Sequence, residues 1–195
     1  MLPVLSAEQL RRLDAWTIAH EPITSIELME RAAIRCVEWL GAHRGELFAD
    51  AATKEQRYLI LVGPGNNGGD GLAMARILSA AGHPVRVCQP FEQLELSYDN
   101  AMNLSRMADV SISVVSSSPA GGPPQVWPGE IVIDALFGTG LSRPLEGDQR
   151  RFVQRLNEQK AKVIAIDLPS GLFPEDNARN DMEGVVRATW TLTFQ

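Results

Sequence analysis

The first forty residues have the hydrophobic spacing of helices. Ser-x-x-Gln at 6–9 and Thr-x-x-Glu at 24–27 match the capping box. In this motif the hydroxyl of the first residue accepts a hydrogen bond from the backbone N–H of the fourth, and the side chain of the fourth accepts one from the backbone N–H of the first. After the second box, apolar residues recur every three or four positions as far as Leu40, and Gly41 is suited to end the helix. The pattern predicts two leading helices.

From residue 57 the period changes to short, continuous apolar runs. Such runs are typical of strands that are buried on both faces of a parallel sheet, and helical or polar stretches separate most of them. The alternation predicts an α/β fold, a doubly wound, Rossmann-like three-layer αβα sandwich with a mostly parallel sheet and N-terminal helices. The predicted strands are 58–62, 84–88, 111–115, 130–136, 162–167 and a final one within 185–194.

One segment stands apart from this alternation. Residues 116–124 combine Pro, Gly and Ser too densely for a helix or a central strand, which predicts a surface loop rather than a linker between domains. At 195 residues we expect one domain that spans 1–195. The chain stops at Gln195 without an evident closing element, so we expect that it can be a piece of a longer protein.

Charge and cysteine content narrow the function classes. With 18 Lys and Arg against 24 Asp and Glu, the net charge of −6 disfavours nucleic acid as a partner. Neither a secretion signal nor an apolar run long enough to span a bilayer is present in the sequence. Cys36 and Cys88 are far apart and belong to no Cys-x-x-Cys motif, so we expect a cytoplasmic protein without disulfides or structural zinc.

The first candidate for chemistry is the glycine-rich segment 63–71, which follows a predicted strand. Its glycines satisfy G-x-G-x-x-G, and the helix start after them would offer free N–H groups to a pyrophosphate. An ordinary NAD site also needs an acidic residue about 20 positions further on, which binds the ribose. Residues 87–90, at that place in this sequence, contain no carboxylate, and the nearest one, Glu92, is expected to lie past the strand. A P-loop is excluded because no Lys-Ser/Thr pair follows.

Asp70 makes this segment unusual. A carboxylate within a phosphate-binding loop repels the anion unless it binds a hydroxyl or a cation is present. The alternative is that Asp70 simply caps the helix that follows, since Asp is a favoured capping residue.

Two further carboxylates end apolar runs. Asp134 and Asp167 each stand where burial without a partner is costly, so together they need a cation, a shared proton or ligand hydroxyls. Asp134 leads into a second glycine-rich loop at 135–144. Asp167 precedes Ser170, which lacks the motif of a nucleophile elbow and is better interpreted as a ligand than as a nucleophile.

These segments together resemble a known family. GPGNNGGDG at 63–71, DALFGTGLSRP at 134–144 and IDLPSG at 166–171, with a similar lead-in at 24–32, resemble the YjeF N-terminal domain family, whose enzymes are NAD(P)H-hydrate epimerases. The resemblance runs from about residue 6 to the end of the chain. It implies that the protein is an isomerase of metabolite repair, which interconverts the R and S forms of hydrated NAD(P)H at nicotinamide carbon 6 without net redox.

The resemblance also implies site residues. It assigns Asn67, Asp134 and Ser170 as ligands of a potassium ion, which would answer the charge problem above. Asp167 is our hypothesis for the catalytic acid–base, and backbone amides of 66–69 and Arg143 would hold phosphates. The implied substrate-binding residues are Asn66, Asn67, Gly68, Gly69, Asp70, Gly138, Thr139, Gly140, Leu141, Ser142, Arg143, Pro144 and Asp167.

Several alternatives stay open at this point. A non-catalytic nucleotide-binding or scaffold module of the same family is the first, and a conventional dehydrogenase is disfavoured by the missing ribose carboxylate. Many members of the family carry an ATP- or ADP-dependent NAD(P)HX dehydratase after this domain, which makes a fused or separate dehydratase an expected partner. The sequence leaves open a homodimer through the leading helices and the preference between NADHX and NADPHX.

Overall fold

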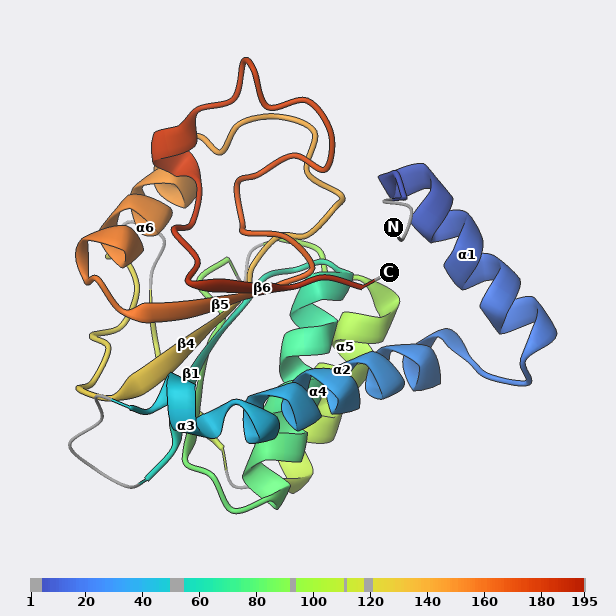
Figure 1. Cartoon of the computed structure of the whole chain (residues 1–195), viewed down its shortest axis with the longest axis horizontal. Helices are drawn as coiled ribbons and strands as arrows, with labels where there is room; N and C mark the ends of the chain where they lie inside the picture. Colours follow the sequence, from blue (N-terminus) through green and yellow to red (C-terminus); the bar gives the residue numbers. More distant parts are fainter. Residues whose placement is uncertain (1–4, 50–54, 92–93, 111, 118–120, 195) are drawn as a thin grey trace.

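The computed structural model describes residues 5–49, 55–91, 94–110, 112–117 and 121–194. They contain a six-stranded sheet in the order β3-β2-β1-β4-β5-β6, in which every neighbouring pair is parallel (Figure 1). The chain moves outward from β1 to β3 and then returns to build the other half from β4. This reversal between β1 and β4 is where doubly wound folds bind ligands, at the carboxyl ends of the strands. The strands are β1 (Arg57–Val62), β2 (Val85–Cys88), β3 (Ser113–Val114), β4 (Glu130–Ala135), β5 (Lys162–Ile166) and β6 (Trp190–Leu192).

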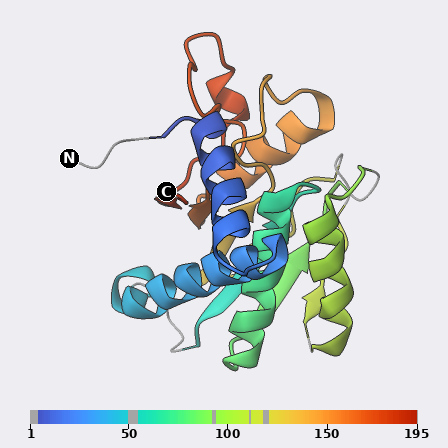
Figure 2. The same cartoon turned by 90° about the vertical axis from the view of Figure 1, so that its right-hand side faces the viewer.

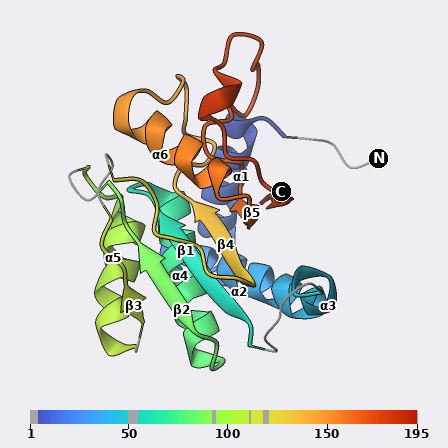
Figure 3. The same ribbon diagram turned by 90° about the vertical axis from the view of Figure 1, so that its left-hand side faces the viewer.

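Helices cover both faces of the sheet, which confirms the predicted three-layer α/β fold (Figure 3). One layer contains α2 (Ser25–Ala42), α4 (Asn66–Ala80) and α5 (Tyr98–Arg106), and the other contains α6 (Gly147–Glu158). Each apolar run of the sequence divides its side chains between the layers because alternate residues of a strand point to opposite faces. In β1, Ile60 faces α2 and α4, whereas Leu61 faces α6.

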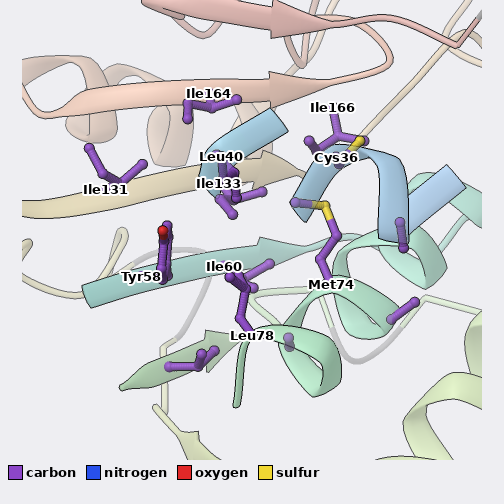
Figure 4. Close-up of a cluster of buried hydrophobic side chains, with 14 of the residues drawn as sticks. Cys36, Leu40, Tyr58, Ile60, Met74, Leu78, Ile131, Ile133, Ile164 and Ile166 are labelled. Carbon is purple, nitrogen blue, oxygen red and sulfur yellow. The ribbon is translucent and has the colours of Figure 1, made fainter. Parts of the chain in front are cut away.

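The larger core lies between the sheet and the α2–α4 layer (Figure 4). Isoleucines from β1, β4 and β5 point from the sheet toward Cys36 and Leu40 of α2 and toward Met74 and Leu78 of α4. These side chains are at most 5% exposed. Burying one such side chain contributes about 1.5–3 kcal/mol, so this core fixes α4 against the strands whose ends form the site.

Both predicted capping boxes are present. Ser6 caps α1 (Ala7–His20) together with Gln9, and Thr24 caps α2 together with Glu27. Helix α2 ends one residue later than predicted, at Ala42, and a short α3 (Arg44–Leu47) follows. Helix α1 lies outside the two helical layers, beside the β6 edge of the sheet, as Figures 1 and 2 both show.

The predicted elements differ from the structure mainly at the sheet edges. Strand β3 contains only two residues of the predicted strand 111–115, and residue 111 lies outside the described residues. Residues 118–120 of the predicted loop also lie outside the described residues. The remaining residues of 116–124 form neither helix nor strand. Strand β6 is shorter than 185–194 because Val185 and Val186 enter the core as irregular chain after a 3-10 turn, Met182–Gly184. Within the described residues, no helix is both long and apolar enough to cross a membrane.

Candidate functional site

The glycine-rich segment is mostly helix rather than loop. Helix α4 begins at Asn66 with Gly65 as its N-cap, so only residues 63–65 make the turn after β1. Asp70 lies one turn inside α4, and the alternative that it caps this helix is therefore wrong. The glycines let the helix approach the sheet: a Cβ at Gly71 would lie 2.7 Å from the Cβ of Ala135 in β4.

A residue that we did not predict holds the turn. The side chain of Asn100 in α5 donates from Nδ2 to the carbonyl oxygens of Gly63 and Gly65, both at 2.8 Å. Asn100 is fully buried, and its Oδ1 has no hydrogen-bond partner. No local motif marks Asn100 in the sequence, because its partners are more than thirty residues away.

Asp134 and Ser170 form one buried hydrogen-bonded pair. Oδ1 of Asp134 accepts from Ser170 Oγ at 2.6 Å, and Oδ2 accepts from the Ser170 backbone N–H at 2.8 Å. Burial raises the pKa of Asp134 to about 6, while the hydrogen bonds from Ser170 and from the Leu136 N–H act in the opposite direction. The structure therefore brings together two of the three residues predicted as potassium ligands.

Asp167 follows β5 in a left-handed backbone conformation, with φ of 66°. The Thr139 N–H donates to its Oδ2 at 2.8 Å, which links Asp167 to the loop after β4. Burial raises the pKa of Asp167, and the hydrogen bond from Thr139 opposes that rise. Gly138 leaves room for the carboxylate, since a Cβ there would lie 2.4 Å from Oδ2 and 3.3 Å from the Cβ of Asn67. Asn67, Gly138 and Asp167 therefore meet at one place.

Asn67 and Asp70 of α4 are buried but unsatisfied. Neither the oxygen nor the nitrogen of the Asn67 carboxamide has a hydrogen-bond partner among the described residues. Asp70 is 8% exposed and accepts no hydrogen bond from the residues that the structure describes. Burial raises the pKa of Asp70 well above its ordinary value, and the nearby carboxylates of Asp167, Asp14 and Asp99 raise it further. Buried polar groups without partners are rare in folded proteins, so these two point to a ligand.

The loop after β4 is the most open part of the site. Gly138, Thr139, Leu141 and Pro144 are partly buried in it. Gly140, Ser142 and Arg143 are exposed, and the guanidinium of Arg143 is the basic group that we predicted for phosphates. The structure thus joins the start of this loop to Asp167 and leaves its far end facing solvent.

A cavity of about 800 Å³ lies beside these residues, between α1, α2 and the start of α4. Asn66 and Asp70 line it, together with three polar residues that the sequence did not suggest: Asp14 of α1, Ser25 of α2 and Asp99 of α5. Asn67, Asp167 and the Asp134–Ser170 pair are not among its lining residues.

The donor atoms at the strand ends are oxygens. Among the described residues, no group of three or more His, Cys, Asp and Glu side chains is arranged to hold a metal ion. A transition-metal centre is therefore unsupported, whereas Asn67, Asp134 and Ser170 offer carboxamide, carboxylate and hydroxyl oxygens that suit a weakly held alkali cation.

Known proteins are similar to this chain in fold and in sequence. A yeast protein, ynu0 (YNL200c), has a crystal structure of the same fold, with a TM-score of 0.72 and 20% identity over 97% of this chain and 79% of that one. NAD(P)H-hydrate epimerases are similar in sequence: that of Roseobacter litoralis is 35% identical, covering 100% of this chain and 89% of the relative, and that of Weissella koreensis is 31% identical, covering 100% and 81%.

A longer relative contains the same unit. The bifunctional NAD(P)H-hydrate repair enzyme Nnr of Thermofilum pendens is 35% identical over 88% of this chain, which spans 34% of that enzyme. The sequence profile described as YjeF-related protein N-terminus matches residues 25–195, which include every residue of the predicted site. The chain belongs to this family of YjeF-related N-terminal proteins.

Proposed function

We propose that this protein is an NAD(P)H-hydrate epimerase, an isomerase of metabolite repair that interconverts the R and S forms of NAD(P)HX at carbon 6 of the hydrated nicotinamide ring. The observation that carries the proposal is the meeting of Asn67, Gly138 and Asp167 at the carboxyl ends of the strands. The names of the relatives from Roseobacter and Weissella support the same activity.

The reaction needs proton transfer at the hydroxyl oxygen on carbon 6. Asp167 is the proposed acid–base: its carboxyl would protonate the departing hydroxyl and recover the proton when water returns. Its raised pKa suits this role because the group must be able to hold a proton closer to neutral pH than an ordinary aspartate does. The Thr139 N–H donates to Oδ2 and fixes the orientation of the carboxylate.

The substrate would lie along the turn of α4 and the loop after β4. The backbone N–H groups of 66–68 stand in the first turn of a 15-residue helix, where free donors and the helix dipole favour phosphate, whereas the Gly69 N–H donates to the Gly65 carbonyl oxygen at 3.3 Å. Exposed Arg143 is the proposed cationic contact for the same phosphates. We propose that the other residues of the loop 138–144 contact the substrate alongside Arg143.

A potassium ion is the proposed cofactor, with Asn67, Asp134 and Ser170 as ligands. The support is the unpartnered buried oxygen of Asn67 and the fully buried carboxylate of Asp134, which has no cationic side-chain partner among the described residues. When bound, the ion would supply positive charge that offsets this carboxylate.

The test of the proposed activity is R-to-S interconversion with Asp167→Asn. We expect kcat to fall by roughly 10²–10⁴-fold, the usual contribution of a positioned acid–base group. Asp176→Asn, which changes an exposed carboxylate on the following loop, is the control and should keep wild-type turnover. Wild-type turnover in a folded Asp167→Asn would remove Asp167 from the role, and an inactive wild type would favour a non-catalytic module.

The test of the cofactor is thermal unfolding in potassium against lithium chloride. For a site that is about 90% occupied, potassium should add about 1.4 kcal/mol to the free energy of unfolding. Asn67→Ala should abolish the difference between the salts. An equal response of the wild type to both salts would contradict the assignment.

The biological setting is also a proposal. Cys36 and Cys88 are buried and form no disulfide, which supports the cytoplasm. The bifunctional relative supports a dehydratase as the partner that consumes the S form. A homodimer is supported by large apolar side chains exposed on the leading helices, Leu13, Trp16 and Ile34. One domain spanning 1–195 stays a prediction.

A further inference from the structure

The three carbonyl groups of the turn between β1 and α4 are all hydrogen-bonded to the start of α5. Asn100 donates from Nδ2 to the carbonyl oxygens of Gly63 and Gly65, both at 2.8 Å. The backbone N–H of Ser97 donates to the carbonyl oxygen of Pro64 at 2.9 Å. A carboxamide nitrogen carries two hydrogen atoms, so Asn100 can supply one to each glycine carbonyl. The direction in which these carbonyl groups point is therefore set by α5.

Fixing a carbonyl group also fixes the N–H group of the same peptide unit. The described residues contain no cis peptide bond, and in a trans peptide the N–H points opposite to the C=O. The Pro64 carbonyl shares its peptide unit with the Gly65 N–H, and the Gly65 carbonyl shares one with the Asn66 N–H. Because both carbonyl groups point toward α5, both N–H groups point away from it.

The side of the turn away from α5 is the side on which β4 lies. Helix α5 stands on the β2–β3 side of β1, and β4 is the neighbour of β1 on the other side (Figure 3). Gly65 and Asn66 are exposed, and a Cβ at Gly65 would meet nothing within 4 Å. Among the described residues, neither of their N–H groups has a hydrogen-bond partner. They are free donors that face open space at the carboxyl edge of the sheet.

The fold does not use the whole carboxamide of Asn100. The side chain is fully buried, yet its Oδ1 has no hydrogen-bond partner among the described residues, which is unfavourable for a buried amide oxygen. The close approach also requires a glycine, since a Cβ at Gly68 would lie 1.9 Å from the Gly63 oxygen and 2.6 Å from Asn100 Nδ2. These costs indicate that Asn100 is needed for the direction of the turn rather than for packing.

We propose that Asn100 is a positioning residue of the epimerase: with the Ser97 N–H, it directs the N–H groups of Gly65 and Asn66 toward the pyrophosphate of NAD(P)HX. The inference rests on the proposed function and adds to it the Gly65 donor and the role of α5. Asn100 acts through the turn. Donors that are oriented before the anion binds need no reorganisation when it arrives, which favours binding.

The test compares two substitutions of Ser97. Its φ of −64° and ψ of 157° suit proline, so Ser97→Pro removes the N–H that holds the Pro64 carbonyl, whereas Ser97→Ala keeps it. Both variants lose the hydroxyl that caps α5, which makes Ser97→Ala the matched reference. The probe is ADP-ribose, which carries the pyrophosphate but no nicotinamide. We expect titration calorimetry to show about tenfold weaker binding to Ser97→Pro, because one charge-assisted hydrogen bond is worth about that factor or more.

A second variant removes the side-chain donors. Asn100→Leu has a similar size but no N–H group, and it should weaken the binding of ADP-ribose at least about tenfold. Ser105→Ala removes an exposed hydroxyl near the other end of α5 and should leave the affinity unchanged. Asn100→Leu leaves two carbonyl groups without their donors, so the Ser97 pair decides the test if this variant fails to fold.

Steady-state kinetics separate positioning from a merely structural role. The phosphates do not react, so their hydrogen bonds stabilise the bound substrate and the transition state equally. Relative to Ser97→Ala, Ser97→Pro should raise the KM for NAD(P)HX about tenfold and change kcat less than about twofold. A merely structural role would instead lower kcat through a smaller folded fraction and leave KM unchanged.

The outcomes distinguish this inference from the proposed function. Equal binding of ADP-ribose by Ser97→Pro and Ser97→Ala, or no binding by the wild type, would overturn the positioning role even in an active epimerase. A fall in kcat at constant KM would also overturn it. A tenfold difference in ADP-ribose binding, in a protein that does not epimerise NAD(P)HX, would support the orientation of the turn and overturn the proposed activity.

Discussion

Strand β4 begins with a buried carboxylate, Glu130, and has a second, Asp134, one residue before its end, and the surroundings of the two differ. Glu130 at its start is 4% exposed and pairs with Arg86 of β2 through two hydrogen bonds, Nε to Oε1 at 2.9 Å and a second nitrogen to Oε2 at 2.6 Å. The Trp127 ring stacks over this guanidinium at 3.8 Å. Asp134, near the other end, has hydrogen bonds but no cationic side chain among the residues that the structure describes.

The contrast separates a structural edge of the sheet from a functional one. At the amino end each buried charge has its counter-charge, whereas at the carboxyl end Asp70 and Asp134 are buried and Asp167 is partly buried, and all three are acidic. A protein gains nothing in stability from like charges held together without a partner, because desolvation and repulsion both oppose them. The imbalance at the carboxyl edge therefore supports the proposed ligand-binding role of these residues.

The largest expected effect comes from breaking the paired edge. Arg86→Met leaves Glu130 buried without its partner and should lower the free energy of unfolding by about 3–5 kcal/mol, measured by urea denaturation. Arg86→Met combined with Glu130→Gln removes both charges and should recover more than half of that loss. Equal stability of the single variant and the wild type would contradict the structural role of the pair.

A smaller effect is expected from disturbing the acidic edge sterically. Gly138→Ala puts a Cβ where Oδ2 of Asp167 lies, 2.4 Å away, and should lower kcat about 10–100-fold through displacement of the carboxylate. Steady-state kinetics would measure this loss. Gly41→Ala is the matched control, since a Cβ there meets nothing within 4 Å. A fully active Gly138→Ala would separate Asp167 from the reaction.

Asp70→Asn should stabilise the protein at neutral and basic pH. Because the pKa of Asp70 is raised in the folded state, the wild type loses stability as pH rises through that value, and each unit of the rise costs about 1.4 kcal/mol. We expect a gain in the free energy of unfolding at pH 8 that shrinks toward pH 4, where Asp70 is increasingly protonated in both states. Urea denaturation without potassium across this range would measure it. A loss of stability at pH 8 would show that Asp70 has a partner.

The smallest effect is expected for an exposed ion pair that belongs to neither edge. Arg187 and Glu183 lie 3.4 Å apart with side chains 68% and 67% exposed. Glu183→Gln should change the free energy of unfolding by less than about 0.5 kcal/mol, because solvent screens such pairs. A larger change would mean that charge pairing by itself, rather than burial, distinguishes the two edges.

The sequence predicted the central strands and the carboxylates at their ends because both depend on local patterns. Continuous apolar runs located β1, β4 and β5, and their final residues placed Asp134 and Asp167 at one edge. The predicted start of α4 was wrong. The glycines at 68, 69 and 71 have low helix propensity and therefore predicted a loop, but close packing on the sheet outweighs that propensity and these residues are helical. Intrinsic preference is a weak guide where a helix must touch a strand.

Asp14, Asp99 and Asn100 could not have been found in this way. They come from α1 and α5, and none belongs to a motif around the glycine-rich segments. They reach the site only because α5 packs on α4 and because α1 lies over the cavity. Residues that meet through tertiary packing leave no local pattern to read.

The left-handed backbone at Asp167 restricts which substitutions can inform on its chemistry. Asn and Asp tolerate a φ near +60°, whereas most other side chains pay a steric penalty there. Most replacements at this position would therefore add a loss of stability of about 1–2 kcal/mol to any loss of catalysis. Asparagine and glycine are the two substitutions whose phenotype can be attributed to the missing carboxylate.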